Sequence, residues 1–194
     1  NSASRFEDQE SDDLTRQYSF NFDNQIDGTS HRLTGDFQYE KSSDLQLGII
    51  TQNSVDIERV VTNEYNEETL IQLDYVRPIG VNGQFEFGYR GQLKSQKTVF
   101  GVDNITDGPI FTPNTNLSNS LIYDQDIQAL YTQYGFKVKD KLSVLLGMRY
   151  EDTTIGINQI ENDTISDINY DGWFPSLNLG FELSEKENIT LAYN

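Results

Sequence analysis

The chain has 194 residues and a formal net charge of −17, from 14 lysines and arginines against 31 aspartates and glutamates. This charge repels phosphate backbones and no basic patch offsets it, which argues against nucleic-acid binding. The chain has no cysteine, which excludes disulfides, thiolate metal sites and cysteine nucleophiles. Its mean hydropathy is −0.60, but 11 tyrosines, 11 phenylalanines and a tryptophan argue against a disordered segment.

Hydrophobic side chains recur with a period of two along most of the chain, and no helical stripe is present. This alternation is typical of a β-strand with one apolar face and one wet face. It is clearest over residues 84–94 and 142–150, whose apolar positions include Phe85, Phe87, Tyr89, Leu93, Leu142, Val144, Leu146, Met148 and Tyr150. No apolar run approaches the ~20 residues of a transmembrane helix.

The alternation predicts about nine strands. In chain order they cover residues 14–24, 31–40, 44–54, 67–78, 84–99, 124–138, 141–157, 172–184 and 188–194. Several exceed the usual soluble strand of about 5–6 residues. They approach the ~9–11 residues that a tilted strand needs to cross a bilayer.

The connections between these strands alternate in length. Tight turns are predicted at residues 40–43, 80–83, 138–141 and 184–188. Longer polar segments are predicted between them, at residues 51–67, 101–123 and 158–171. Short turns at one end and long loops at the other are typical of outer-membrane barrels, whose long loops face outward.

The wet face and the aromatic residues favour a membrane barrel over a soluble sheet. Glu86, Arg90 and Lys94 follow one another on the wet face of one strand. Aromatic residues recur near strand ends, as girdles at the lipid interfaces require. They are Tyr39, Tyr75, Tyr123, Tyr150, Trp173 and Phe174.

The predicted fold is therefore all-β, an antiparallel up-and-down transmembrane β-barrel segment with short periplasmic turns and long extracellular loops. Nine strands do not close a single-chain bacterial barrel, which has an even number. Residues 1–194 are thus expected to be part of a single outer-membrane barrel domain, with the remaining strands elsewhere. Two alternatives stay open: a soluble secreted all-β adhesin or carbohydrate-binding sandwich, and a plain structural or pore barrel.

The last third resembles a known family. Residues 123–136 lead through a Lys-Asp-Lys turn into residues 142–151, which end in Leu-Gly-Met-Arg-Tyr-Glu. A Phe-Pro-Ser-Leu motif follows at 174–177, and the chain ends in Leu-Ala-Tyr-Asn at 191–194. These motifs resemble TonB-dependent receptor barrels and the outer-membrane β-barrel family of Bacteroidetes, well over residues 120–194 and loosely over 67–100.

The resemblance implies an outer-membrane transport receptor that binds an extracellular ligand and passes it to the periplasm. It further implies outer-membrane lipid as surroundings, a plug domain, a TonB-type energy-coupling protein and a surface lipoprotein as partners. No part of the sequence resembles a plug domain. The transported ligand and its binding residues are unknown from the sequence.

No catalytic residue, cofactor or metal site is predicted, and an enzyme is not expected, because no nucleophile–base pair, metal ligand set or phosphate loop is visible. His31 is the only histidine and is expected to have a plain surface or lumen role. Asp103, Asn104 and Asp107 offer oxygen ligands for Ca²⁺, but a solvated acidic loop is the favoured interpretation.

Acidic loop residues are expected to give the outer mouth a negative potential. They are Glu58, Glu64, Glu67, Glu68, Asp103, Asp107, Asp124 and Asp126. Steering of cationic ligands is one interpretation. General solubility and binding of divalent ions is the favoured one.

Overall fold

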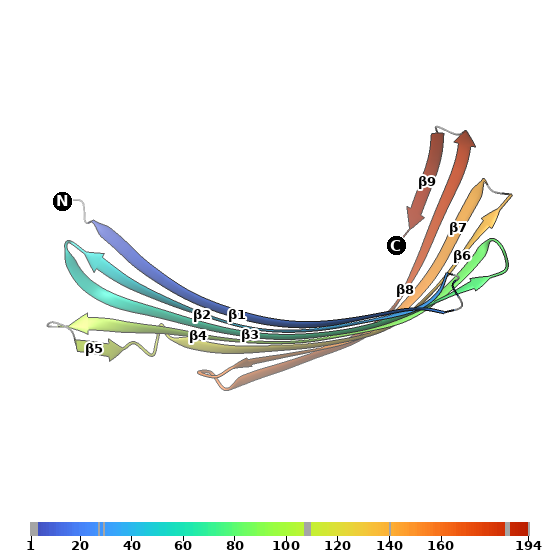
Figure 1. Cartoon of the computed structure of the whole chain (residues 1–194). Coiled ribbons are helices and arrows are strands. Elements are labelled where there is room, and N and C mark those ends of the chain that lie inside the picture. The colour runs from blue at the N-terminus through green and yellow to red at the C-terminus, as the bar shows by residue number, and fades with distance from the viewer. Residues whose placement is uncertain are drawn as a thin grey trace.

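The computed structural model describes residues 4–26, 28, 30–106, 110–139, 141–184 and 187–193. They form one antiparallel sheet in which each strand pairs with the next along the chain, except that β4 pairs with both β5 and β6 (Figure 1). The strands are β1 Arg5–Ile26, β2 His31–Gln52, β3 Val55–Ile79, β4 Gly83–Thr106, β5 Ile110–Pro113, β6 Asn119–Val138, β7 Leu142–Gln159, β8 Thr164–Ser184 and β9 Glu187–Tyr193. The predicted all-β, up-and-down fold is confirmed.

The register divides the side chains of the sheet between two faces, because residues directly opposite each other point to the same side. We name each face after one residue of β4. Phe87 shares its face with Tyr75 of β3 and Thr132 of β6, which gives the Phe87 face. Arg90 shares the other face with Gln72 of β3 and Ala129 of β6, which gives the Arg90 face.

A belt of apolar side chains crosses the Phe87 face from β1 to β9. Its members are Tyr18, Phe20, Phe22, Leu33, Phe37, Tyr39, Ile71, Leu73, Tyr75, Phe85, Phe87, Tyr89, Leu130, Tyr134, Phe136, Val144, Leu146, Met148, Tyr150, Trp173, Leu177, Leu179, Phe181, Ile189, Leu191 and Tyr193. Trp173 is 66% exposed and Phe20 is also 66% exposed. The belt has no protein cover, since the described residues bury only Val102 and Ala129 as hydrophobic core.

This arrangement disagrees with the sandwich alternative. A β-sandwich buries its apolar faces between two packed sheets. The described residues form a single sheet, so nothing in it plays the part of the second layer. The described residues contain no helix that is long and apolar enough to cross a membrane.

The sheet is open at both sides. β1 and β9 lie at its two edges, and in the described part of the chain they do not pair with each other. A small barrel closed within these residues, the other alternative, would require that pairing. β1 also leaves one full side of a 22-residue strand without a backbone partner in the sheet.

The connections sort to two ends of the sheet. We call one the Gly80 end, where β1 meets β2, β3 meets β4, β6 meets β7 and β8 meets β9. We call the other the Asn53 end, where β2 meets β3 and β7 meets β8. The predicted turn at 80–83 is confirmed. β6 and β7 are antiparallel neighbours on either side of the turn predicted at 138–141, and β8 and β9 on either side of the one predicted at 184–188, while residues 140, 185 and 186 lie outside the described residues. The turn at 40–43 is wrong, because β2 runs through it without a break.

The prediction of long loops at the Asn53 end is also largely wrong. β2 and β3 meet in a tight turn at Asn53 and Ser54, both with positive φ. Most of residues 51–67, 101–123 and 158–171 therefore lie in strands that extend far beyond the apolar belt. The segment between β4 and β6 contains the additional short strand β5. The number of strands is still nine, because the strands predicted at 31–40 and 44–54 form the single strand β2 and because β5 was not predicted.

Candidate functional site

The Arg90 face is polar where the Phe87 face is apolar. Behind the belt, one register row runs through Asp36, Gln72, Arg90, Ala129 and Glu151, on five neighbouring strands. The next row towards the Gly80 end contains Thr34, Asp74, Gly88, Tyr131 and Arg149. From β2 to β7 most positions of both rows carry charged or hydrogen-bonding groups, and on β8 the rows end at Gly172 and Phe174.

The central feature of these rows is a hydrogen-bond network between β3 and β6. The Tyr131 hydroxyl donates to Asp74 Oδ1. Gln72 Nε2 donates to Asp74 Oδ2 at 2.8 Å and to the Tyr131 hydroxyl at 3.3 Å. β4 lies between the two strands, and Gly88 stands where the Tyr131 ring crosses it. A Cβ at Gly88 would overlap the Tyr131 ring, so only glycine fits at this position.

A second polar group lies on β7. Arg149 pairs with Glu151 of the same strand at 2.6 Å, and the Thr153 hydroxyl donates to Glu151 Oε1 at 3.4 Å. Thr153 is only 1% exposed, as is Ala129. Arg90 has no ion-pair partner among the described residues. It is therefore a cation of this face that is available to a group from outside the sheet.

The polarity of the two faces reverses on β6–β8 towards the Asn53 end. Beyond Tyr150 and Trp173 the Phe87 face carries mostly polar side chains, among them Asp126, Asp152 and Asp171, and the apolar exceptions are Ile122 and Ile165. The Arg90 face of the same segments becomes apolar. We call the apolar residues there the apolar wall: Tyr123, Ile127, Ile155, Ile157, Ile168 and Tyr170.

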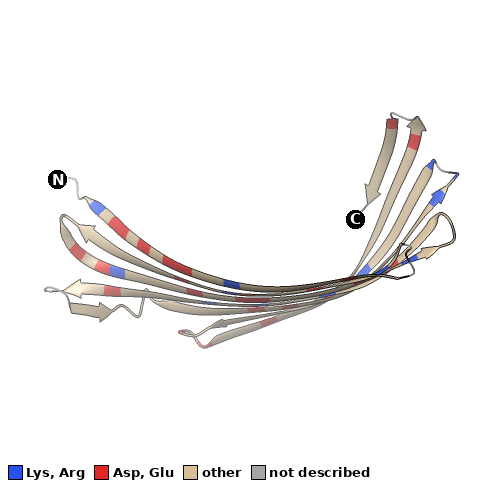
Figure 2. Cartoon of the chain, viewed as in Figure 1, with Lys and Arg blue, Asp and Glu red and all other residues tan. Residues whose placement is uncertain are grey.

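The Arg90 face of β1–β3 is acidic at the same end of the sheet. We call its carboxylates the acidic rows: Asp13, Glu40, Asp44, Glu64 and Glu68. Asp44 stands directly opposite both Asp13 and Glu64, and Glu40 stands opposite Glu68. Figure 2 shows carboxylates concentrated on the Asn53 halves of these strands. Like charges directly opposite each other destabilise a sheet, so these rows oppose its stability.

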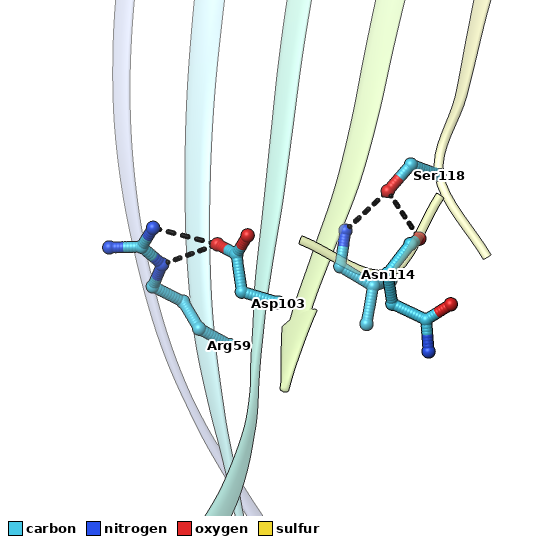
Figure 3. A network of polar contacts seen from close by, with 5 residues as sticks. Arg59, Asp103, Asn114 and Ser118 are labelled. Atoms are coloured by element: carbon cyan, nitrogen blue, oxygen red, sulfur yellow. Dashed lines mark hydrogen bonds and ion pairs between the residues drawn. The ribbon is translucent and has the colours of Figure 1, made fainter. Parts of the chain in front are cut away.

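The β4–β5 hairpin is fastened to the sheet by polar contacts (Figure 3). Arg59 of β3 pairs with Asp103 at 2.7 Å, and its guanidinium lies 3.8 Å from the centre of the Phe111 ring. The Ser118 hydroxyl donates to the Asn114 carbonyl at 2.9 Å and accepts from the Val102 amide at 3.0 Å. These contacts hold the β4–β5 hairpin against the sheet.

These contacts also bear on the Ca²⁺ alternative. Asp103 is paired with Arg59, and Asn104 Oδ1 accepts a hydrogen bond from Asn114 Nδ2 at 3.4 Å. Asp107 lies outside the described residues. Within the described ranges no group of three histidine, aspartate or glutamate side chains is arranged to hold a metal ion.

The other residues singled out from the sequence fall on both faces. His31 lies on the Phe87 face, with Nε2 2.7 Å from the Tyr75 hydroxyl. Of the acidic residues expected at one mouth, Glu58, Glu64 and Glu68 lie on the Arg90 face. The Phe87 face carries Glu67, Asp103, Asp124 and Asp126. The apolar wall was not predicted from the sequence. Its signal in the sequence is that, beyond Tyr150, the positions that belong to the Phe87 face lose their apolar residues.

Comparisons with known proteins agree with this geometry. The model of the outer membrane protein beta-barrel family matches residues 10–194. The fold is similar to the ferric citrate transporter FecA in its unliganded form, with TM-score 0.64 and 16% identity over 91% of this chain. It is also similar to the ferric yersiniabactin uptake receptor FyuA from Yersinia pestis, with TM-score 0.54 and 16% identity over 82% of this chain. The chain spans about a quarter of either structure, 26% and 27%. No match is found among curated protein sequences.

Proposed function

Because the chain belongs to the outer membrane protein beta-barrel family, we propose that it is part of the wall of a larger transport receptor. The family places the protein in the outer membrane. In the proposed receptor, residues 1–194 belong to one barrel domain whose other strands pair with the edges of β1 and β9. The receptor takes up a ligand from outside the cell and releases it into the periplasm.

The observation that carries this proposal is the division of the sheet into an apolar belt and a polar face behind it. The belt on the Phe87 face is suited to lipid, because lipid-facing positions of membrane barrels are apolar between two aromatic girdles. The Tyr150–Trp173 ring pair, with centroids 4.9 Å apart, and the Tyr18–Tyr39 pair, 6.3 Å apart, mark its border towards the Asn53 end. The Arg90 face then lines the lumen.

The extension of the strands gives the orientation. At the Asn53 end, β2 and β3 continue more than ten residues past the belt, whereas at the Gly80 end the belt nearly reaches the turns. Outer-membrane barrels keep their short turns in the periplasm. We therefore assign the Gly80 end to the periplasm and the Asn53 end to the outside.

The proposed partners follow from the receptor role. A plug domain would fill the lumen and contact the polar rows around Tyr131 and Arg90. A TonB-type protein would supply the energy, and a surface lipoprotein would approach the Asn53 end. The named similar structures are a transporter and an uptake receptor, which supports a role in import.

The experiment separates a receptor from a plain pore. The complete protein is reconstituted into liposomes, and the passive efflux of radiolabelled glucose is measured. A plugged receptor is expected to show no efflux above empty liposomes. In cells, deletion of its gene and deletion of the energy-coupling protein are expected to abolish growth on the same nutrient. Rapid, size-limited efflux from the liposomes would instead establish a plain pore.

A further inference from the structure

We propose that the Asn53 half of the Arg90 face binds an amphipathic cation, a ligand with an apolar or aromatic body and a positive group roughly 14 Å away. This inference rests on the proposed function, since it names the class of ligand that the receptor would take. It is carried by two surfaces on the same face of the sheet, the apolar wall and the acidic rows.

The apolar wall is uncovered in a place where lipid does not explain it. Tyr170 is 51% exposed and Ile168 46% exposed, while Ile155 and Ile157 are partly exposed. All of them lie on the face opposite the lipid belt and beyond its border at Trp173. Contiguous exposed apolar surface of this kind marks a binding site. An apolar or aromatic group is the partner that this wall fits.

The acidic rows are not neutralised by ion pairs, although Lys94 stands directly opposite Glu68. Among the described residues none of their five carboxylates makes an ion pair. Asp44 accepts hydrogen bonds only from neutral donors, Ser11 and Gln46, and Glu68 accepts one from Gln92. Because the carboxylates stand opposite one another, a bound cation would relieve repulsion that the folded sheet otherwise retains.

The register fixes the spacing between the two surfaces. One row runs from Glu40 and Glu68 through Lys94 and Gln125 to Ile155 and Ile168. Glu68 and Ile155 are three strand steps apart, which is roughly 14 Å at about 4.8 Å per step. Lys94 is the only cation between them in this row. A second copy of the chain, with its charge of −17, would bring like charge to the acidic rows.

The test uses the complete protein in detergent and two probes that differ only in charge. N-dansyl-1,8-diaminooctane carries an aromatic body and a terminal ammonium, and 8-(dansylamino)octanoate carries a carboxylate at the same distance. Dansyl fluorescence reports binding. The ammonium probe is expected to bind at least about tenfold more tightly at low ionic strength, and this preference is expected to shrink in 0.5 M NaCl because salt screens exposed charges.

Two variants assign the binding to this face. Ile168→Asn is expected to weaken both probes by about tenfold, since burial of one large apolar side chain is worth at least that factor. Glu68→Gln is expected to weaken only the ammonium probe, by a few-fold. The matched controls Asn169→Ala and Asp126→Asn lie on the Phe87 face and are expected to leave both affinities unchanged. The melting temperature of each variant verifies its folding.

Four results would overturn the inference. They are equal or tighter binding of the carboxylate probe, no binding of either probe, affinities that ignore Ile168→Asn and Glu68→Gln in folded protein, and a structure of the complete protein in which its own loop covers the apolar wall. None of these disproves a transport receptor. Passive efflux of glucose would disprove the receptor without bearing on the preference between the probes, so the two failures are distinguishable.

Discussion

Tyr131 on β6 donates a hydrogen bond to Asp74 on β3, although the whole of strand β4 lies between them. The bond ties together strands that share no backbone ladder. It depends on Gly88, the residue of β4 over which the tyrosine ring passes. Three residues that are distant in the sequence therefore act as one unit on the polar face.

The first prediction concerns Gly88. A Gly88→Ala substitution places a methyl group in the path of the Tyr131 ring and separates its hydroxyl from Asp74. The free energy of unfolding is expected to fall by about 1–3 kcal/mol, the range for overpacking a well-packed site. Thermal unfolding of the complete barrel in detergent measures the change.

The control is Gly101→Ala on the same strand, where the nearest atom to a new Cβ is the Val61 carbonyl oxygen at 3.9 Å. Its effect is expected to be much smaller. Two outcomes would show that the unit of Tyr131, Asp74 and Gly88 does not contribute to stability. One is an equal melting temperature for Gly88→Ala and Gly101→Ala, and the other is a melting temperature of Tyr131→Phe equal to that of the wild type.

The second prediction tests which face meets lipid. Leu145 and Leu146 are neighbours on β7, but Leu146 lies on the Phe87 face and Leu145 on the Arg90 face. Leu146→Arg is expected to cost about 2–4 kcal/mol, the penalty for arginine at a lipid-facing position near the midplane of a barrel. Leu145→Arg is expected to cost clearly less, because its guanidinium reaches the polar side.

Folding of both variants into phospholipid vesicles, followed by denaturant titration, gives the two free energies. An equal penalty, or a larger one for Leu145→Arg, would contradict the assignment of the Phe87 face to lipid.

The third prediction is a pH dependence at the β7–β8 turn. Glu161 lies in this turn and accepts a hydrogen bond from the Ser120 amide at 2.5 Å, which lowers the pKa of its carboxyl below the ordinary value. A carboxyl with a lowered pKa in the folded state contributes stability above its unfolded pKa and loses it as the pH falls through the folded pKa. The turn should therefore loosen on acidification below about pH 4.5.

Hydrogen exchange of the Ser120 amide between pH 3 and 6, corrected for intrinsic rates, follows this loss. Glu161→Gln should lower protection at pH 6 and remove most of its pH dependence. The comparison variant is Asp167→Asn, a neighbouring carboxylate on β8, which should retain the wild-type profile. A pH-independent protection of Ser120 in the wild type would refute the role of Glu161.

The fourth prediction concerns the β4–β5 hairpin. Arg59→Ala removes the ion pair to Asp103 and the contact with the Phe111 ring, each worth roughly 1 kcal/mol or less at a partly exposed site. Limited proteolysis within residues 110–118 is expected to become several-fold faster. Arg5→Ala, which removes the more exposed pair with Glu58, is expected to leave this segment protected.

The alternation of apolar and polar residues predicted the two faces of the sheet correctly wherever one face is apolar. The opposed positions in residues 84–94 and 142–150 lie on the Phe87 and Arg90 faces as predicted. The prediction failed at Glu40–Ser43, where both faces of β2 are polar and a strand looks like a turn. The ends of the long strands also lack a clear alternation of apolar and polar residues, and they were therefore predicted as long loops.

The hydrogen-bond network of Gln72, Asp74 and Tyr131 could not be predicted from the sequence, for a different reason. Tyr131 and Asp74 are 57 residues apart and meet only because three strands have a particular register. A one-residue slip would move each side chain to the other face. Short motifs and composition do not determine that register, so the family resemblance gave the architecture but not the partners of individual side chains.

The position of the aromatic border on each strand also indicates the tilt of the strands relative to the membrane. The register row through Tyr150 reaches β2 at Gly35, whereas the border on β2 is Tyr39, four residues further along. β2 and β7 are four strand steps apart, so between these two strands the border shifts by one residue per strand on average, whereas Tyr18 and Tyr39, like Tyr150 and Trp173, stand directly opposite each other. With about 3.3 Å per residue and about 4.8 Å between strands, a horizontal membrane surface requires the strands to tilt by roughly 35°. A complete barrel whose border shifted by this average all the way round would have a shear number equal to its number of strands.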